Sequence, residues 1–357
     1  MRQPLVPRAL IVLVGIAGAL IVLFGLREVA SLAGPFVLAL VLVIAVSPVR
    51  GWLLRVGAPQ WVQVAVPFLI LVLVLLGMAG VLSVTALQLS ELAPAYAGRF
   101  EKLIADGRAF AIEHGVSNEQ LDRAVASFDP GRVIEIAQSL LGGVIGVFSA
   151  LFLIFVLLLA MCLDAPATSR VLRSGEGRSA ALVEALGRFA RKTRRYLIVS
   201  TVFGVINAIL NVIALYLIGV PLPLLWGVLA LIANYIPNIG FVIALLPPAM
   251  LALLDGGLNE MVLVIVAYVI ANVVTQSLLL PKFLGDAVGL STTMTFLSLI
   301  VWTFVLGPLG AILAIPLSLL AKALLIDSDP SAAWAGALIS NRPITPRAGS
   351  ASHRSDA

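Results

Sequence analysis

Residues 196–254 read YLIVSTVFGVINAILNVIALYLIGVPLPLLWGVLALIANYIPNIGFVIALLPPAMLALL, without a single charged side chain. Water-soluble folds do not carry apolar runs of this length, whereas a helix that spans a bilayer needs about 20 apolar residues. The run is interrupted at residues 234–240, NYIPNIG, by two amides, a proline and a glycine. Irregular backbone at membrane depth is tolerated where protein or a water-filled cavity surrounds it, so the interruption indicates where function lies.

The composition of the whole chain also indicates a membrane protein. Apolar residues make up 61% of the chain and charged residues 11%, whereas about 25% of a soluble chain is charged. The net charge of +5 resides in segments between apolar blocks, which a positive-inside bias explains better than nucleic-acid binding. One cysteine, Cys162, and two histidines, His114 and His353, provide neither a disulfide framework nor a zinc site. We therefore expect no cofactor and no metal.

Apolar blocks outside the first stretch extend this interpretation to the whole chain. The basic start, Met1–Arg8, precedes an apolar block too long for a signal peptide, so we expect a retained first span. The second block, 29–49, closes at Pro48. The sequence predicts an all-α polytopic transmembrane protein with about six to eight membrane segments. The expected divisions are a cytoplasmic N-terminus (1–8), three transmembrane helices (9–90), an extracytoplasmic helical insert (91–137), a fourth transmembrane helix (138–163), a basic cytoplasmic loop (164–195), a transport core (196–326) and a disordered cytoplasmic tail (327–357).

The charge of the segments between the blocks predicts the orientation. Segment 164–195 carries eight Lys or Arg against three Asp or Glu, and cytoplasmic loops carry such an excess. Counting crossings from this segment places 91–137 outside and both termini in the cytoplasm.

Two Gly/Pro-interrupted segments in the second half of the chain resemble each other. Gly240 follows Gly219 by 21 residues, and Gly310 follows Gly289 by the same number. Paired interruptions of this kind point to a transporter built from repeats, with its site near the breaks. Residues 222–254 and 292–325 are then either re-entrant hairpins of two short helices, forming an inverted repeat, or full spans with a kink. We expect hinges at the breaks, at Pro237, Gly240, Gly307, Pro308, Gly310 and Pro316.

Uncharged polar side chains in the same region occur in pairs four residues apart, which share one face of a helix. Amides donate and accept hydrogen bonds, so they suit a neutral polar solute. The alternative for any one pair is a buried bond between helices, worth about 0.6 kcal/mol. The candidate pathway residues are Asn207, Asn211, Asn234, Asn238, Asn272 and Gln276.

Charged residues are otherwise rare in this half of the chain. Lys282 and Asp286 are the charges between the last two apolar blocks, where they could form a gate, an ion-coupling pair or an interfacial salt bridge. Ser291 is placed to cap the helix that follows it. No charged residue or histidine lies well inside an apolar block, which argues against a buried proton relay, an intramembrane protease or a metalloenzyme. We therefore do not expect an enzyme.

The order of these motifs resembles that of the autoinducer-2 exporter family of bacterial membrane proteins. The likeness covers roughly residues 9–325. It rests on Gly219-Val220-Pro221, Ile236-Pro237-Asn238-Ile239-Gly240, Gln276 followed by Leu280-Pro281-Lys282, Gly289-Leu290-Ser291, and the segment from Gly307-Pro308-Leu309-Gly310 to Pro316-Leu317.

The resemblance implies a permease of the bacterial cell membrane that assembles into a ring-like homo-oligomer and exports a small polar signal. Some members look like sodium/proton antiporters, which keeps cation/proton antiport open, with Lys282 and Asp286 as its ionisable candidates. A scaffold that does not transport, and whose insert binds partners, is a third interpretation.

Overall fold

The computed structural model describes residues 8–114, 151–168, 180–237, 239–280 and 290–328. Within these ranges the chain is helical and contains no strand, and six of its helices are long and apolar enough to cross a membrane. The predicted all-α polytopic fold is confirmed. The helices are α1 (Arg8–Glu28), α2 (Ala30–Arg55), α3 (Gln60–Glu113), helix Leu151–Thr168, α6 (Ala180–Ile218), α7 (Pro223–Ala233), α8 (Gly240–Gly256), α9 (Leu258–Asn272), the π-helical η2 (Val273–Leu279), α11 (Thr292–Leu306), α12 (Pro308–Lys322) and the π-helical η4 (Ala323–Asp327).

The second helix does not end at Pro48 as its sequence suggested, but continues to Arg55. A proline inside a helix leaves the carbonyl four residues earlier without its amide donor. Here the hydroxyl of Ser47 donates a 2.7 Å hydrogen bond to the carbonyl oxygen of Ile44, the acceptor that Pro48 cannot serve. The neighbouring serine thus compensates for the proline, and the helix survives.

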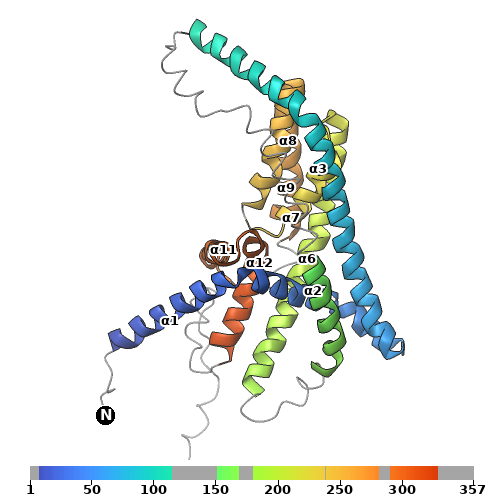
Figure 1. Cartoon of the computed structure of the whole chain (residues 1–357), viewed down its shortest axis with the longest axis vertical. Helices are drawn as coiled ribbons and strands as arrows, with labels where there is room; N and C mark the ends of the chain where they lie inside the picture. Colours follow the sequence, from blue (N-terminus) through green and yellow to red (C-terminus); the bar gives the residue numbers. More distant parts are fainter. Residues whose placement is uncertain (1–7, 115–150, 169–179, 238, 281–289, 329–357) are drawn as a thin grey trace, which may run out of the picture.

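Two helices continue through polar segments of the sequence. α3 has 54 residues, of which Gln60–Leu89 form the candidate span. Its remaining part, residues 90–113, is called the α3 extension below, and Figure 1 shows it reaching past the ends of the other helices. α6 begins at Ala180, inside the basic segment, and runs to Ile218 without a break. The divisions expected at residues 91 and 196 therefore fall inside continuous helices. Residues 115–137 of the insert and the tail after residue 328 lie outside the described residues.

The first interrupted segment folds as two helices, α7 and α8, which enter and leave at the same end of the molecule. Leu222, before α7, lines a groove together with Gln88 of α3. Asp255, at the end of α8, bonds to Tyr96 of the α3 extension. The break between the helices lies instead against the middle of α6, where the side-chain amide of Asn234 bonds to Ser200. This course favours the hairpin over a single kinked span.

The second interrupted segment forms a tighter hairpin. α11 ends at Leu306 and α12 begins at Pro308, with Gly307 between them at φ 64°. Ser291 caps α11 as expected, because its hydroxyl accepts from the backbone amide of Met294. Ile236, at the tip of the first hairpin, packs against buried residues of α11 and α12, Leu299 and Ala314. The tip of the first hairpin therefore packs against the middle of the second hairpin.

Candidate functional site

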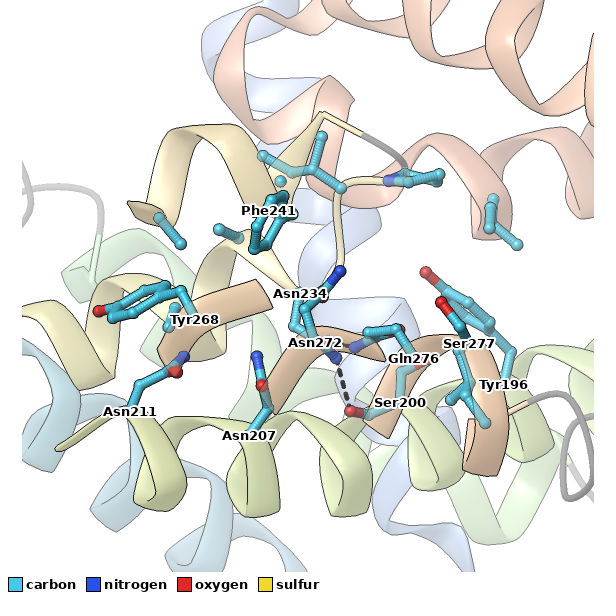
Figure 2. A pocket seen from close by; sticks show the side chains of 18 residues that line it. Tyr196, Ser200, Asn207, Asn211, Asn234, Phe241, Tyr268, Asn272, Gln276 and Ser277 are labelled. Atoms are coloured by element: carbon cyan, nitrogen blue, oxygen red, sulfur yellow. Dashed lines mark hydrogen bonds between the residues drawn. The ribbon is translucent and has the colours of Figure 1, made fainter. Parts of the chain in front are cut away.

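A cavity of about 400 Å³ lies where α6, the first hairpin and α9 meet (Figure 2). Two rows of polar side chains face each other across it. α6 contributes Ser200, Asn207 and Asn211, while α9 and η2 contribute Tyr268, Asn272 and Gln276. The residues of each row recur at helical spacing, so they project from one face of their helix. The remaining lining residues are Tyr196, Ala230, Ala233, Asn234, Ile236, Pro237, Gly240, Phe241, Ala244, Ser277, Leu280 and Ile315.

Hydrogen bonds join the two rows at two levels. At the first, the amide nitrogen of Asn234 donates a 2.8 Å bond to the carbonyl oxygen of Ser200, and its amide oxygen accepts from Gln276. At the second, the hydroxyl of Thr275 donates to the amide oxygen of Asn207 at 3.3 Å. The π-helical geometry of η2 helps to present consecutive residues to two partners, Thr275 to Asn207 of α6 and Gln276 to Asn234, and such segments are frequent at functional sites.

A third level, formed by Asn211 and Tyr268, has no such bond. Both residues are 1% exposed, and the side-chain oxygen of each is buried without a hydrogen-bond partner among the described residues. Figure 2 shows both side chains at the end of the cavity away from Gln276. A buried polar atom left unsatisfied costs about 1–3 kcal/mol, which a structural role does not explain.

The cavity is open at one end and closed at the other. Ser277 is exposed and Gln276 and Asn234 are half-buried, whereas Asn207 is 7% exposed. Beyond Asn211 the helices pack through an apolar cluster that includes Leu215, Trp226 and Val264. Hereafter the open end is the end at Ser277, and the closed end is the end at Asn211 and Tyr268.

Three glycines make the break possible because a larger residue would not fit. A Cβ on Gly204 of α6 would lie 2.8 Å from the amide nitrogen of Asn234. A Cβ on Gly240 would collide with the carbonyl of Ala233, and one on Gly310 with the carbonyl of Trp302. Gly240 and Gly310 thus perform the same task in the two hairpins, which is to let two helices meet at their ends.

The cavity lining carries no charge among the described residues. No group of three His, Cys, Asp or Glu that could hold a metal ion occurs in the described ranges. Such a lining can exchange hydrogen bonds with a neutral polar molecule, whereas an ion would enter without a counter-charge. Tyr196 closes the side of the cavity near the break, where its hydroxyl donates to the carbonyl oxygen of Tyr235 at 3.3 Å.

Five of the six predicted pathway residues line this one cavity: Asn207, Asn211, Asn234, Asn272 and Gln276. Of the predicted hinges, Pro237 and Gly240 line it, whereas Gly307, Pro308, Gly310 and Pro316 belong to the second hairpin. Asn238, Lys282 and Asp286 lie outside the described residues, so their roles stay predictions. The sequence interpretation missed Ser200 and Tyr268. Tyr268 lies four residues before Asn272, so extending the spacing by one turn would have found it.

The fold and this site define a polytopic membrane permease: apolar helices, two interrupted hairpins and a polar cavity between them. The chain matches the model of the AI-2E family transporters over residues 10–328, and it belongs to that family. It is 28% identical to the AI-2 transport protein TqsA of Escherichia coli K12 over 302 residues, 85% of this chain and 88% of that protein. It is 26% identical to the putative transport protein YhhT of the same strain over 315 residues, 87% of this chain and 89% of the other. A putative transport protein of Haemophilus influenzae is 28% identical over 329 residues, 90% and 93% of the two chains.

Proposed function

We propose that this permease exports a small uncharged polar solute, and that the solute passes through the cavity between α6, the first hairpin and α9. The observation that carries the proposal is the two facing rows of amide and hydroxyl groups in an uncharged lining. The relative TqsA is named for transport of autoinducer-2. A molecule of that kind, small and polar, is therefore a first candidate for this chain.

The shape of the cavity supports alternating access. A solute can enter at the open end and reach Asn207, but the apolar cluster around Leu215, Trp226 and Val264 blocks the closed end. Passage requires these helices to separate there while the open end closes. The Asn234–Gln276 bond lies next to the open end and joins the break of the first hairpin to η2, so it is placed to act as the inner gate.

The direction of transport follows from the proposed orientation. With the basic segment and both termini in the cytoplasm, α6 runs outward from Ala180 to Ile218. The open end then faces the cytoplasm and the closed end faces outward, which is the state from which an exporter loads. A cysteine at Asn259 in a Cys162→Ser background tests this orientation, because labelling from the cytoplasmic side alone would contradict it.

We also propose that the protein assembles as a homo-oligomer in the cell membrane. Helix α1 packs against little else in the described chain, and its apolar side chains stand exposed, with Leu13 at 66% and Ile21 at 72%. Lipid and a neighbouring subunit would both cover such a surface. Chemical cross-linking between cysteines placed on α1 distinguishes a subunit interface from lipid. A cross-linked dimer supports the interface, whereas lipid alone gives no cross-linked product.

Flux measurements in proteoliposomes test the transport route. Asn234→Leu and Gln276→Leu each remove the inner-gate bond and part of the polar lining. We expect both variants to fold and to lower the efflux of autoinducer-2, or of another neutral solute that the wild type moves, about tenfold. Asn259→Leu is the matched control, because Asn259 is exposed and lies outside the cavity. Equal flux in the wild type, the two cavity variants and the Asn259→Leu control would refute this route.

A further inference from the structure

We propose that Asn211 and Tyr268 form a recognition subsite at the closed end of the cavity, which binds an uncharged hydroxyl group of the solute and rejects a carboxylate. The inference rests on the proposed function, because it assumes that the solute reaches this end. It assigns to Tyr268 a role in specificity.

The first argument is the state of the polar groups along the cavity. Asn207 and Asn234 use their amides in bonds to Thr275, Ser200 and Gln276, as residues that join helices do. The side-chain oxygens of Asn211 and Tyr268 have no partner among the described residues, although both residues are 99% buried. Buried polar groups in native proteins nearly always have a partner. Both oxygens are inaccessible in this closed state, so a solute supplies that partner as the closed end loosens around it.

The second argument is the chemistry that the pair demands. The oxygen of Asn211 accepts a hydrogen bond and cannot donate one, whereas the phenolic hydroxyl of Tyr268 can do either. A solute hydroxyl can donate to the first and can accept from the second. The match also holds if the nitrogen and oxygen of the Asn211 amide are exchanged, because the solute hydroxyl can then accept from the nitrogen. A carbonyl cannot donate, so it satisfies only one of the two.

The third argument is electrostatic. The cavity lining includes no basic or acidic side chain among the described residues, and the closed end is enclosed by apolar residues such as Leu215 and Val264. A carboxylate or an ammonium group would have to shed its water there without gaining a counter-charge. The same enclosure that leaves Asn211 unpaired therefore excludes charged groups.

Efflux from proteoliposomes that contain the full-length protein tests the subsite. The probes are radiolabelled erythritol, a small neutral polyol, and erythronate, its acid analogue of nearly equal size. We expect the wild type to move erythritol at least about tenfold faster than erythronate. Tyr268→Phe, which removes one hydroxyl and keeps the ring, should lower erythritol efflux about five- to twentyfold, and Asn211→Leu similarly. The matched control is Tyr216→Phe, on the same helix as Asn211 but 76% exposed and outside the cavity.

A gain of function separates the subsite from a loss of fold. Asn211→Asp keeps the size of the side chain and adds an acid, so the variant should move the amine analogue of erythritol better, relative to erythritol, than the wild type does. Size-exclusion chromatography in detergent establishes that each variant is folded.

The outcomes distinguish the two proposals. Equal efflux of erythritol and erythronate, or unchanged selectivity in Tyr268→Phe, overturns the subsite and leaves transport through the cavity standing; a pair that binds only structural water would give this result. If the wild type moves neither these probes nor autoinducer-2 nor another small neutral solute faster than protein-free vesicles do, the proposed function itself fails.

Discussion

The hydroxyl of Tyr96 donates a 2.7 Å hydrogen bond to the carboxylate of Asp255, joining the α3 extension to the turn between α8 and α9 across 159 positions of sequence. Arg99 forms a salt bridge with the same carboxylate, and its guanidinium lies 5.2 Å from the centre of the Tyr96 ring. The turn that they hold joins α8 to α9, two of the helices that pack at the closed end of the cavity. The contact therefore fixes the closed end from outside the candidate spans.

The first prediction concerns this contact. Tyr96→Phe removes the hydrogen bond and leaves the ring, so we expect a loss of about 1–2 kcal/mol in local stability. Amide hydrogen exchange should become faster at the turn that includes Gly256 and stay unchanged in the middle of α6. Tyr216→Phe serves as the control. Unchanged exchange at the turn would mean that the bond does not hold the closed end.

The second prediction concerns the pH range of the same contact. Burial raises the pKa of the Tyr96 phenol above its ordinary value of 10.0, and the positive charge of Arg99 offsets part of the rise. A raised pKa in the folded state means that the neutral phenol stabilises the fold at every pH below the unfolded pKa, and that this stability is lost as the pH rises further. Tyrosinate absorbance should therefore show a component above pH 10 that Tyr96→Phe removes. A titration identical in both proteins would contradict the assignment.

The third prediction tests how Asn234 is positioned. Gly204→Ala introduces a methyl group against the amide of Asn234, which must turn away from Ser200 and Gln276. We expect solute efflux to fall about three- to tenfold with little change in melting temperature, because alanine favours the helix. Gly80→Ala is the control, since a Cβ on Gly80 meets nothing within 4 Å. A fall in efflux equal to that of the control would show that the position of the amide does not matter.

The fourth prediction concerns the two close approaches between helix ends. Gly240→Ala and Gly310→Ala each place a methyl group on a backbone carbonyl, which cannot move aside as a side chain can. We expect each substitution to cost about 3 kcal/mol or more and to lower the yield of folded protein sharply. Gly77→Ala, at a position with open space, should be harmless. Near-normal melting temperatures for both variants would show that the hairpins can open without damage.

The fifth prediction maps the depth of the cavity. Cys162 is the one cysteine of the chain, so Cys162→Ser provides a background for single cysteines. A cysteine at Ser277 should react readily with a membrane-impermeant thiol reagent, whereas one at Asn211 should react roughly tenfold more slowly, because it is reached only through local opening. Bound solute should protect the second position further. Equal rates at both positions would remove the distinction between open and closed ends.

The sequence predicted the parts of the site that depend on residue type and spacing. Amides at helical spacing in an apolar run, such as Asn207 and Asn211, are costly unless they serve a purpose, so they could be found without coordinates. The two breaks could be found for the same reason. The order of these motifs along the chain then indicated the family.

Other features depend on contacts that no local pattern reveals. Ser200 contributes its backbone carbonyl to Asn234, and a carbonyl has no signature in the sequence. Tyr268 continues the spacing of Asn272 and Gln276, but the burial of its hydroxyl without a partner among the described residues depends on the fold. Pro48 was expected to end a helix, but the hydroxyl of Ser47 replaced the missing donor. The continuity of α3 past Leu89 was missed because polarity marks where lipid ends, and a helix does not have to end there.

The length of α3 has a mechanical consequence. Its 54 residues correspond to about 80 Å, and the 24 residues beyond the candidate span reach about 36 Å from it. Tyr96 and Arg99 attach the α3 extension to Asp255, and the helix continues for about 21 Å beyond Arg99. A displacement of the extension is therefore transmitted to Asp255 through these two contacts. A partner bound at the far end of α3 would thus act on the turn at the closed end of the cavity.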